Sequence, residues 1–147
     1  MDDVERTRLR ALYEERVTAQ ERYSPGWGAL WSRLCERVLV HGGELVVPPC
    51  AVDADTARLA EGAELKVGRV RHSEGEPSAC HDNVIALWRR GRVEAIGTGY
   101  ALSEDGLWRR HSWGVLDDGT LVETTEARVR YVGVTLRGEV AEAFARG

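Results

Sequence analysis

Three side chains of this sequence are of the types that cysteine-based acyl transfer requires. Cys80 stands just before the apolar stretch 84–88, which is typical of a helix that begins near the thiol. A thiol is a good nucleophile only as the thiolate, and a helix N-terminus stabilises that anion. His111 and Glu123 follow on two predicted strands, where an imidazole could accept the thiol proton and a carboxylate could orient the ring. We therefore predict a cysteine nucleophile, a histidine base and an acidic partner.

His111 is the best of the four histidines as a partner for Cys80. His41 lies beside two glycines at a predicted helix end, and His72 lies at a strand end. His81 directly follows Cys80 on the helix, so its side chain points about 100° away. A strand can hold the imidazole of His111 rigidly. Ser78 is predicted to cap the helix.

The turn between the two strands decides whether Glu123 can reach His111. If 118–119 is a two-residue loop, Glu123 points to the opposite face, and Thr124 or Glu126 would have to orient the ring. If 117–119 is a three-residue loop, Gly119 takes the left-handed position and Glu123 shares the face of His111. The diagonal distance is then about 7–8 Å between backbones, which a glutamate spans. We predict the three-residue loop.

The elements that must position these side chains follow from periodicity and from turn residues. Helices are predicted at 3–22, 27–40, 54–61 and 79–90, with a short helix after Gly138. Strands are predicted at 44–47, 65–71, 92–102, 108–116, 120–125 and 127–136. Helices come first and an antiparallel sheet follows, which predicts an α+β fold. We expect one domain over 1–147, with a helical part and short strands at 1–77. Its core, at 78–136, would pack the cysteine helix on the sheet.

Composition and charge narrow the function classes. Hydrophobic residues at 43% and charged residues at 30% are typical of a soluble globular protein, and a net charge of -4 gives no argument for nucleic acid. The N-terminus is charged and has no apolar stretch behind it, so we expect no signal peptide, no membrane span and a cytoplasmic location. The three cysteines lack disulfide or metal spacing, and Cys35 falls on the apolar stripe of the second helix. We expect no metal and no cofactor.

A longer pattern resembles the core of the transglutaminase-like, papain-like cysteine enzymes. It covers residues 78–125 and consists of Cys80, Asn83, Leu87, Gly91, Gly97-Thr98-Gly99-Tyr100, His111-Ser112-Trp113, Gly119 and Glu123-Thr124-Thr125. That family has a cysteine at a helix start, a glycine that closes the helix, a Gly-Tyr strand, a His-x-Trp strand and an acid-containing strand. Glu123 stands where the family usually has aspartate. The N-terminal 77 residues resemble no family.

The resemblance implies acyl transfer from an amide, ester or thioester, with Cys80 as nucleophile, His111 as base and Glu123 as orienting residue. It also implies that the backbone N–H of Cys80 is one oxyanion donor. The other donor is left open among Trp27, Trp31, His72 and Gln20. Hydrolysis, transamidation and acetyl transfer share this machinery, because the outcome depends on whether water or an amine reaches the acyl-enzyme. The expected partner is a small-molecule or peptide acyl substrate.

Four further residues are expected to bind substrate: Trp113, Gly99, Tyr100 and Trp108. Aromatic side chains beside the histidine would shield it from water, whereas a glycine would either let substrate approach the backbone or only relieve strand crowding. Two other functions remain open at this stage. One is a papain-like binding module that has lost the chemistry, and the other is a metal site made of His72, Cys80, His81 and His111.

Overall fold

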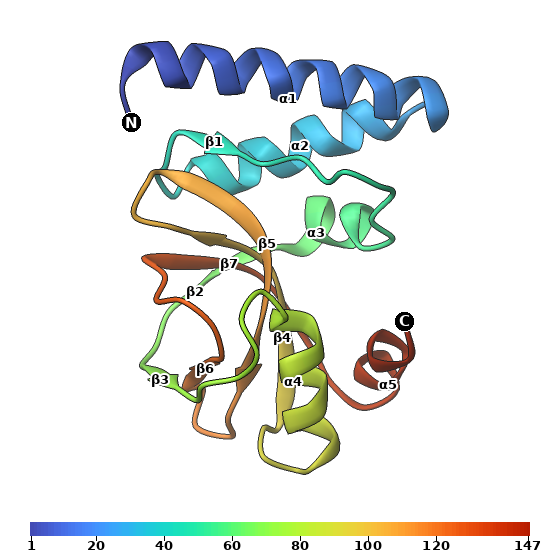
Figure 1. Cartoon of the computed structure of the whole chain (residues 1–147). Coiled ribbons are helices and arrows are strands. Elements are labelled where there is room, and N and C mark those ends of the chain that lie inside the picture. The colour runs from blue at the N-terminus through green and yellow to red at the C-terminus, as the bar shows by residue number, and fades with distance from the viewer.

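The elements of the computed structural model, which describes residues 1–147, are five helices and a curled sheet of seven strands (Figure 1). The helices are α1 (Asp3–Tyr23), α2 (Trp27–Leu39), α3 (Thr56–Gly62), α4 (Cys80–Arg89) and α5 (Gly138–Arg146). The strands are β1 (Leu45–Val46), β2 (Glu64–Lys66), β3 (Val70–His72), β4 (Ala95–Leu102), β5 (Leu107–Val115), β6 (Leu121–Glu123) and β7 (Arg130–Leu136). The predicted α+β class is confirmed.

The sheet is mixed, whereas the sequence predicts an antiparallel one. Its strand order is β2-β7-β4-β5-β6-β3, and β1 pairs with β5 beside this path. The pairs β1–β5 and β3–β6 are parallel, and the other pairs are antiparallel. The predicted strand at 65–71 is also wrong, because β2 and β3 are separate strands at opposite ends of the strand order. Periodicity reads this stretch as one extended segment, since it carries no information about which neighbour each half pairs with.

The helices cover one face of the sheet. The apolar stripe of α2 packs with α3 and with alternate residues of β4 and β5, such as Tyr100 and Trp108. Farther along the same face, Val84 of α4 and Ala141 of α5 pack on Ile96 of β4. Figure 1 shows α1 lying along α2 at one end of the molecule, away from α4 and α5. None of the five helices has the length and apolar character needed to cross a membrane.

The opposite face of the sheet has its own smaller core. Trp113 of β5 and Tyr131 of β7 contact edge to face, with 5.0 Å between their ring centroids. The indole of Trp113 lies directly on Gly97, where an added Cβ would come within 1.9 Å of its nitrogen. Because side chains alternate along a strand, His111 and Glu123 also lie on this face.

Candidate active site

Cys80 is the first residue of α4, as the sequence predicts, but Ser78 does not cap the helix. The N-cap is Ala79, and no side chain accepts a hydrogen bond there. Ser78 instead has φ 59, a left-handed conformation that turns the chain into the helix. Asn83 ties down the approach loop, because its side chain accepts a hydrogen bond from the backbone N–H of Glu76 (3.1 Å) and donates one to the carbonyl of Glu76 (2.9 Å). The position of the thiol is thus fixed by the loop before it and the helix after it.

A gap in the pairing of β5 brings the thiol to the strand. β1 covers residues 107–108 of β5 and β6 covers only residues 114–115, so residues 109–113 have no partner strand on that edge. The backbone N–H of Ser112 lies in this gap and is one of the groups that lower the pKa of the Cys80 thiol. The gap therefore lets a backbone N–H group of β5 act on the sulfur.

His111 connects Cys80 and Glu123. Its Nε2 lies 2.8 and 3.0 Å from the two carboxylate oxygens of Glu123, and its ring lies close enough to the thiol of Cys80 that each group shifts the pKa of the other. Since Nε2 faces the carboxylate, Nδ1 is the ring nitrogen left for the thiol. His111 is 1% exposed and Glu123 is fully buried, so this contact excludes water.

The three-residue turn that the geometry requires is confirmed. Gly114 pairs with Val122 and Val115 with Leu121, which leaves 117–119 as the loop, and Gly119 has φ 88. The register places Glu123 on the face of His111.

Two further side chains hold the Glu123 carboxylate. The hydroxyl of Tyr131 donates to Oε1 at 2.7 Å, while the backbone N–H and the hydroxyl of Thr125 donate to Oε2 at 2.9 and 3.0 Å. Burial raises the pKa of Glu123, but these donors and His111 outweigh burial and bring the pKa down to about 2. Glu123 is therefore ionised at neutral pH and fixed in orientation.

The pKa values of Cys80 and His111 shift in opposite directions. Burial raises the pKa of the Cys80 thiol, but the His111 ring and the backbone N–H groups of Ser112 and His81 outweigh it, so the pKa lies below its usual value. Burial lowers the pKa of His111, but the hydrogen bonds to Cys80 and Glu123 outweigh that effect and raise it. Both shifts favour a thiolate beside an imidazolium, which is the reactive form of a cysteine nucleophile.

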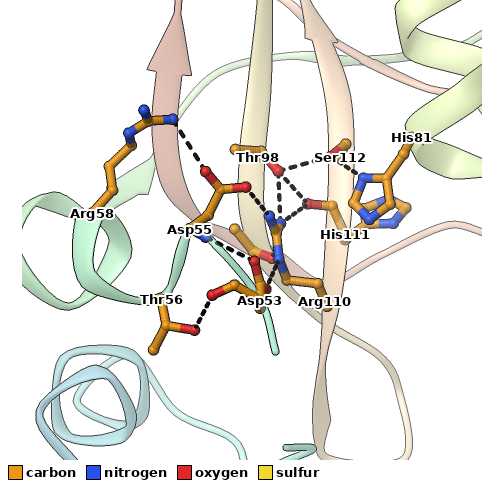
Figure 2. Close-up of polar contacts among 10 residues, drawn as sticks. Asp53, Asp55, Thr56, Arg58, His81, Thr98, Arg110, His111 and Ser112 are labelled. Atoms are coloured by element: carbon orange, nitrogen blue, oxygen red, sulfur yellow. Dashed lines mark hydrogen bonds and ion pairs between the residues drawn. The ribbon is translucent and has the colours of Figure 1, made fainter. Parts of the chain in front are cut away.

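A second polar network lies beneath α4, on the helix-covered face of the sheet (Figure 2). The Nδ1 atom of His81 hydrogen-bonds the hydroxyl of Ser112, which lies 2.8 Å from the hydroxyl of Thr98. Arg110 donates to that threonine hydroxyl at 2.6 Å. This network pins the first turn of α4 to β5. Sequence reasoning rejected His81 as the base, and the structure gives it this anchoring contact instead.

The thiol opens onto a surface pocket of about 780 Å³. Its walls are the start of α4, the turn between β4 and β5, and the segment between β6 and β7. The lining is almost wholly polar and consists of Ser78, Cys80, Ser103, Glu104, Asp105, Arg109, Arg110, His111, Thr125, Glu126, Ala127 and Arg128. A substrate that reaches Cys80 would therefore meet charged side chains.

None of the four residues expected to bind substrate lines this pocket. Tyr100 and Trp108 are buried in the core under α2, and the indole of Trp108 donates to the carbonyl of Gly42 at 2.8 Å. Trp113 is fully buried. At Gly99 an added Cβ would lie 2.2 Å from the carbonyl oxygen of Val132, so this glycine allows close strand packing. The three aromatic side chains therefore belong to the hydrophobic core and do not reach the pocket.

The candidate oxyanion donors also lie away from the pocket lining. Trp27 and Trp31 stack on each other in the core under α2, with 5.5 Å between ring centroids. Gln20 is buried on α1, and His72 is exposed on β3. Of the expected oxyanion donors, only Cys80, whose backbone N–H lies at the N-terminus of α4, lines the pocket.

The remaining thiols and possible metal ligands are also placed by the structure. Burial raises the pKa of Cys35 to about 12, whereas Cys50 is exposed. No group of three or more histidine, cysteine, aspartate or glutamate side chains is arranged to hold a metal ion. Cys80 is thus the only cysteine with a partner that favours its thiolate.

Sequence reasoning missed two residues near the proposed triad, Tyr131 and Arg128. Tyr131 could have been found only from the pairing of β7 with β4, which the sequence does not specify. Arg128 is one of nineteen arginines spread along the chain, with no local pattern to mark it.

Comparison of the chain with protein-family models, with curated proteins and with solved structures found no match.

Proposed function

We propose that this protein is an acyl-transfer enzyme, a hydrolase or an acyltransferase, that works through a thioester on Cys80. The observation that carries the proposal is the place of His111, which hydrogen-bonds the Glu123 carboxylate at 2.8 Å and lies close enough to Cys80 to lower the pKa of its thiol. The order of these residues along the chain, their placement on a helix start and two strands, and the α+β architecture support a transglutaminase-like, papain-like enzyme.

The first half of the reaction forms the acyl-enzyme. The Cys80 thiolate attacks the carbonyl carbon of an amide, ester or thioester, and the carbonyl electron pair moves onto oxygen. The backbone N–H of Cys80 donates to that oxyanion. The intermediate collapses, and the leaving group departs with a proton from the His111 imidazolium. Glu123 stabilises the imidazolium and holds the ring in place.

The second half releases the acyl group. His111, now neutral, takes a proton from water or an amine as that nucleophile attacks the thioester carbonyl, and the carbonyl electron pair moves onto oxygen. Collapse expels the Cys80 thiolate and restores the thiolate–imidazolium pair. Water gives a carboxylic acid, whereas an amine gives an amide.

The test is capture of the acyl-enzyme by intact-protein mass spectrometry. Purified Cys50→Ser protein, which lacks the exposed thiol, is mixed with a panel of acyl thioesters. We expect one acyl adduct that maps to Cys80, disappears in Cys80→Ala and forms at least tenfold more slowly in His111→Ala. Added amine or prolonged hydrolysis then discharges the adduct and identifies the acceptor.

An adduct that forms equally fast in His111→Ala would remove His111 from the mechanism. Absence of any adduct, together with slow alkylation of Cys80, would favour the binding module. Cys80→Ala should keep the thermal stability of the parent because the thiol is only half-buried, so loss of the adduct cannot be attributed to unfolding.

A further inference from the structure

Arg128 is a pocket residue whose guanidinium is held only by neutral oxygens. Its Nε donates to the backbone carbonyl of Glu126 at 3.1 Å, its Nη1 to the hydroxyl of Ser103 at 3.4 Å and its Nη2 to the hydroxyl of Thr125 at 3.3 Å. It makes none of the ion pairs of the structure. These contacts fix the direction of a positive charge without neutralising it.

The other two arginines of the pocket are neutralised by carboxylates. Arg109 binds both oxygens of Asp105, at 3.2 and 2.7 Å. Arg110 binds Asp53 at 2.7 Å and Asp55 at 3.0 Å. The third arginine is therefore the one cation of this pocket that has no acidic partner.

The free donors of Arg128 suit a planar anion. A guanidinium has five N–H groups, and the three contacts above occupy three of them, so two remain. A carboxylate binds such a fork with matched geometry and opposite charge. The Thr125 hydroxyl that accepts from Arg128 also donates to Glu123, so this cation lies next to the proposed catalytic residues.

We propose that Arg128 binds a carboxylate of the acyl substrate, so that the substrates of this site are acidic acyl compounds. The inference rests on the proposed function, because it names the substrate class of the same pocket. The bound carboxylate neutralises Arg128 while the carbonyl of the same molecule meets Cys80.

Two carboxylates in the pocket, those of Glu104 and Glu126, would favour the opposite charge. Both side chains are exposed, so water and salt screen them, and neither forms an ion pair. Arg128 is partly buried and directed by three hydrogen bonds, so its charge acts more strongly on a bound group. A substrate with an amine is the rival outcome that the experiment must separate.

The experiment compares alkylating reagents that share one electrophile and differ only in a remote charge. Iodoacetyl derivatives of glycine, β-alanine and γ-aminobutyrate carry a carboxylate at increasing reach. Each is matched with its neutral amide and with an iodoacetyl diamine of equal length. The rate of Cys80 labelling is measured in the Cys50→Ser background, and the acid-to-amide rate ratio is taken within each variant. The ratio cancels any general change in thiol reactivity.

We expect the acid to label Cys80 roughly tenfold faster than its amide for at least one spacer, with a saturable rate. The ratio should collapse to about one in Arg128→Gln and recover in part in Arg128→Lys, which keeps the charge but loses the fork. Arg92→Gln is the matched control, because this exposed arginine lies beyond the far end of α4, and it should keep the parent ratio.

An acid-to-amide ratio near one in the parent protein, with fast labelling by the amide, would overturn the carboxylate site and leave the proposed function intact. Faster labelling by the amine would assign specificity to Glu104 or Glu126 instead. If neither the acid nor the neutral amide labels Cys80, the thiol is not activated, and both proposals fall. A high ratio that persists in Arg128→Gln would also reject Arg128 as the binding residue.

Discussion

His111 is the residue through which Cys80 and Glu123 act on each other. Its ring is buried between an acid whose pKa is lowered to about 2 and a thiol whose pKa is also lowered, and its own pKa is raised. Each anion stabilises the imidazolium, and the imidazolium stabilises each anion. Removal of one member should therefore change the titration of the other two.

The pH dependence of Cys80 alkylation tests this coupling. In the Cys50→Ser background, iodoacetamide should label Cys80 at a lower pH than it labels a free thiol, because the pKa of Cys80 is lowered. Cys35 should stay unlabelled, since burial raises its pKa to about 12. Labelling should set in at higher pH in His111→Ala, and at an intermediate pH in Glu123→Gln, because a neutral amide stabilises imidazolium less well.

The control for this profile is His41→Ala, since His41 lies outside the pocket lining and should leave the profile unchanged. If His111→Ala retained the parent profile, the thiolate would owe its stability to the helix and the backbone N–H groups alone.

At the scale of elements, the sequence predicted the features that depend on local signals better than it predicted the pairing of strands. Gly91, with φ 71, ends α4 as expected, and the apolar stripe of α2 is buried as expected. Both signals act within a few residues of chain. The split of residues 65–71 into β2 and β3, by contrast, depends on β7 and β6, strands that lie more than fifty residues later in the sequence. No local pattern carries that information.

Gly99 tests how closely β4 and β7 must pack. A Cβ there would lie 2.2 Å from the carbonyl oxygen of Val132 and 2.5 Å from the Cα of Gly133, and neither backbone atom can move without disturbing the sheet. We expect Gly99→Ala to lower the free energy of unfolding by about 1–3 kcal/mol, measured by urea denaturation. Gly99→Ala should slow the alkylation of Cys80 less than His111→Ala does.

Gly62→Ala is the matched control, because a Cβ at this helical position would lie 3.7 Å from Val134, an ordinary contact. It should keep or slightly raise the stability, since alanine has the higher helix propensity. An unchanged free energy of unfolding in Gly99→Ala would mean that β4 and β7 can shift apart to admit the added Cβ without loss of stability.

For the whole molecule, the site joins segments that are distant in sequence. The thiol comes from α4, the imidazole from β5, the carboxylate from β6 and the phenol that holds it from β7. The sequence was enough to propose the first three, because helix start, strand parity and turn length are local properties. It did not reveal the pocket, because the segment 125–128 meets the turn at 103–105 only through the folding of the sheet.

Acid should lower the free energy of unfolding, because it protonates the buried Glu123 carboxylate. Its pKa falls from a usual value of 4.5 to about 2 in the folded protein, so the ionised carboxylate stabilises the fold above pH 4.5. That contribution, of the order of 3 kcal/mol, is lost as the pH falls from 4.5 through about 2. The free energy of unfolding of the parent should exceed that of Glu123→Gln near neutral pH, and the difference should shrink in acid.

Urea denaturation of both proteins across this pH range measures the difference. The lowered pKa values of Asp105 and Asp118 occur in both proteins and cancel in the comparison. A difference that stays constant from neutral pH to acid would show that the folded carboxylate titrates as it does in the unfolded chain.

The position of the Glu123 carboxylate depends on the number of residues in the turn at 117–119. Loss or gain of one residue there would carry the carboxylate through the sheet to the helix-covered face, away from His111. Gly119, with φ 88, is constrained by its backbone, whereas the exposed Asp117 side chain makes no hydrogen bond that the strands need. A substitution of the side chain at 117 therefore leaves the site intact, whereas an insertion or deletion of one residue in this turn separates the Glu123 carboxylate from the imidazole.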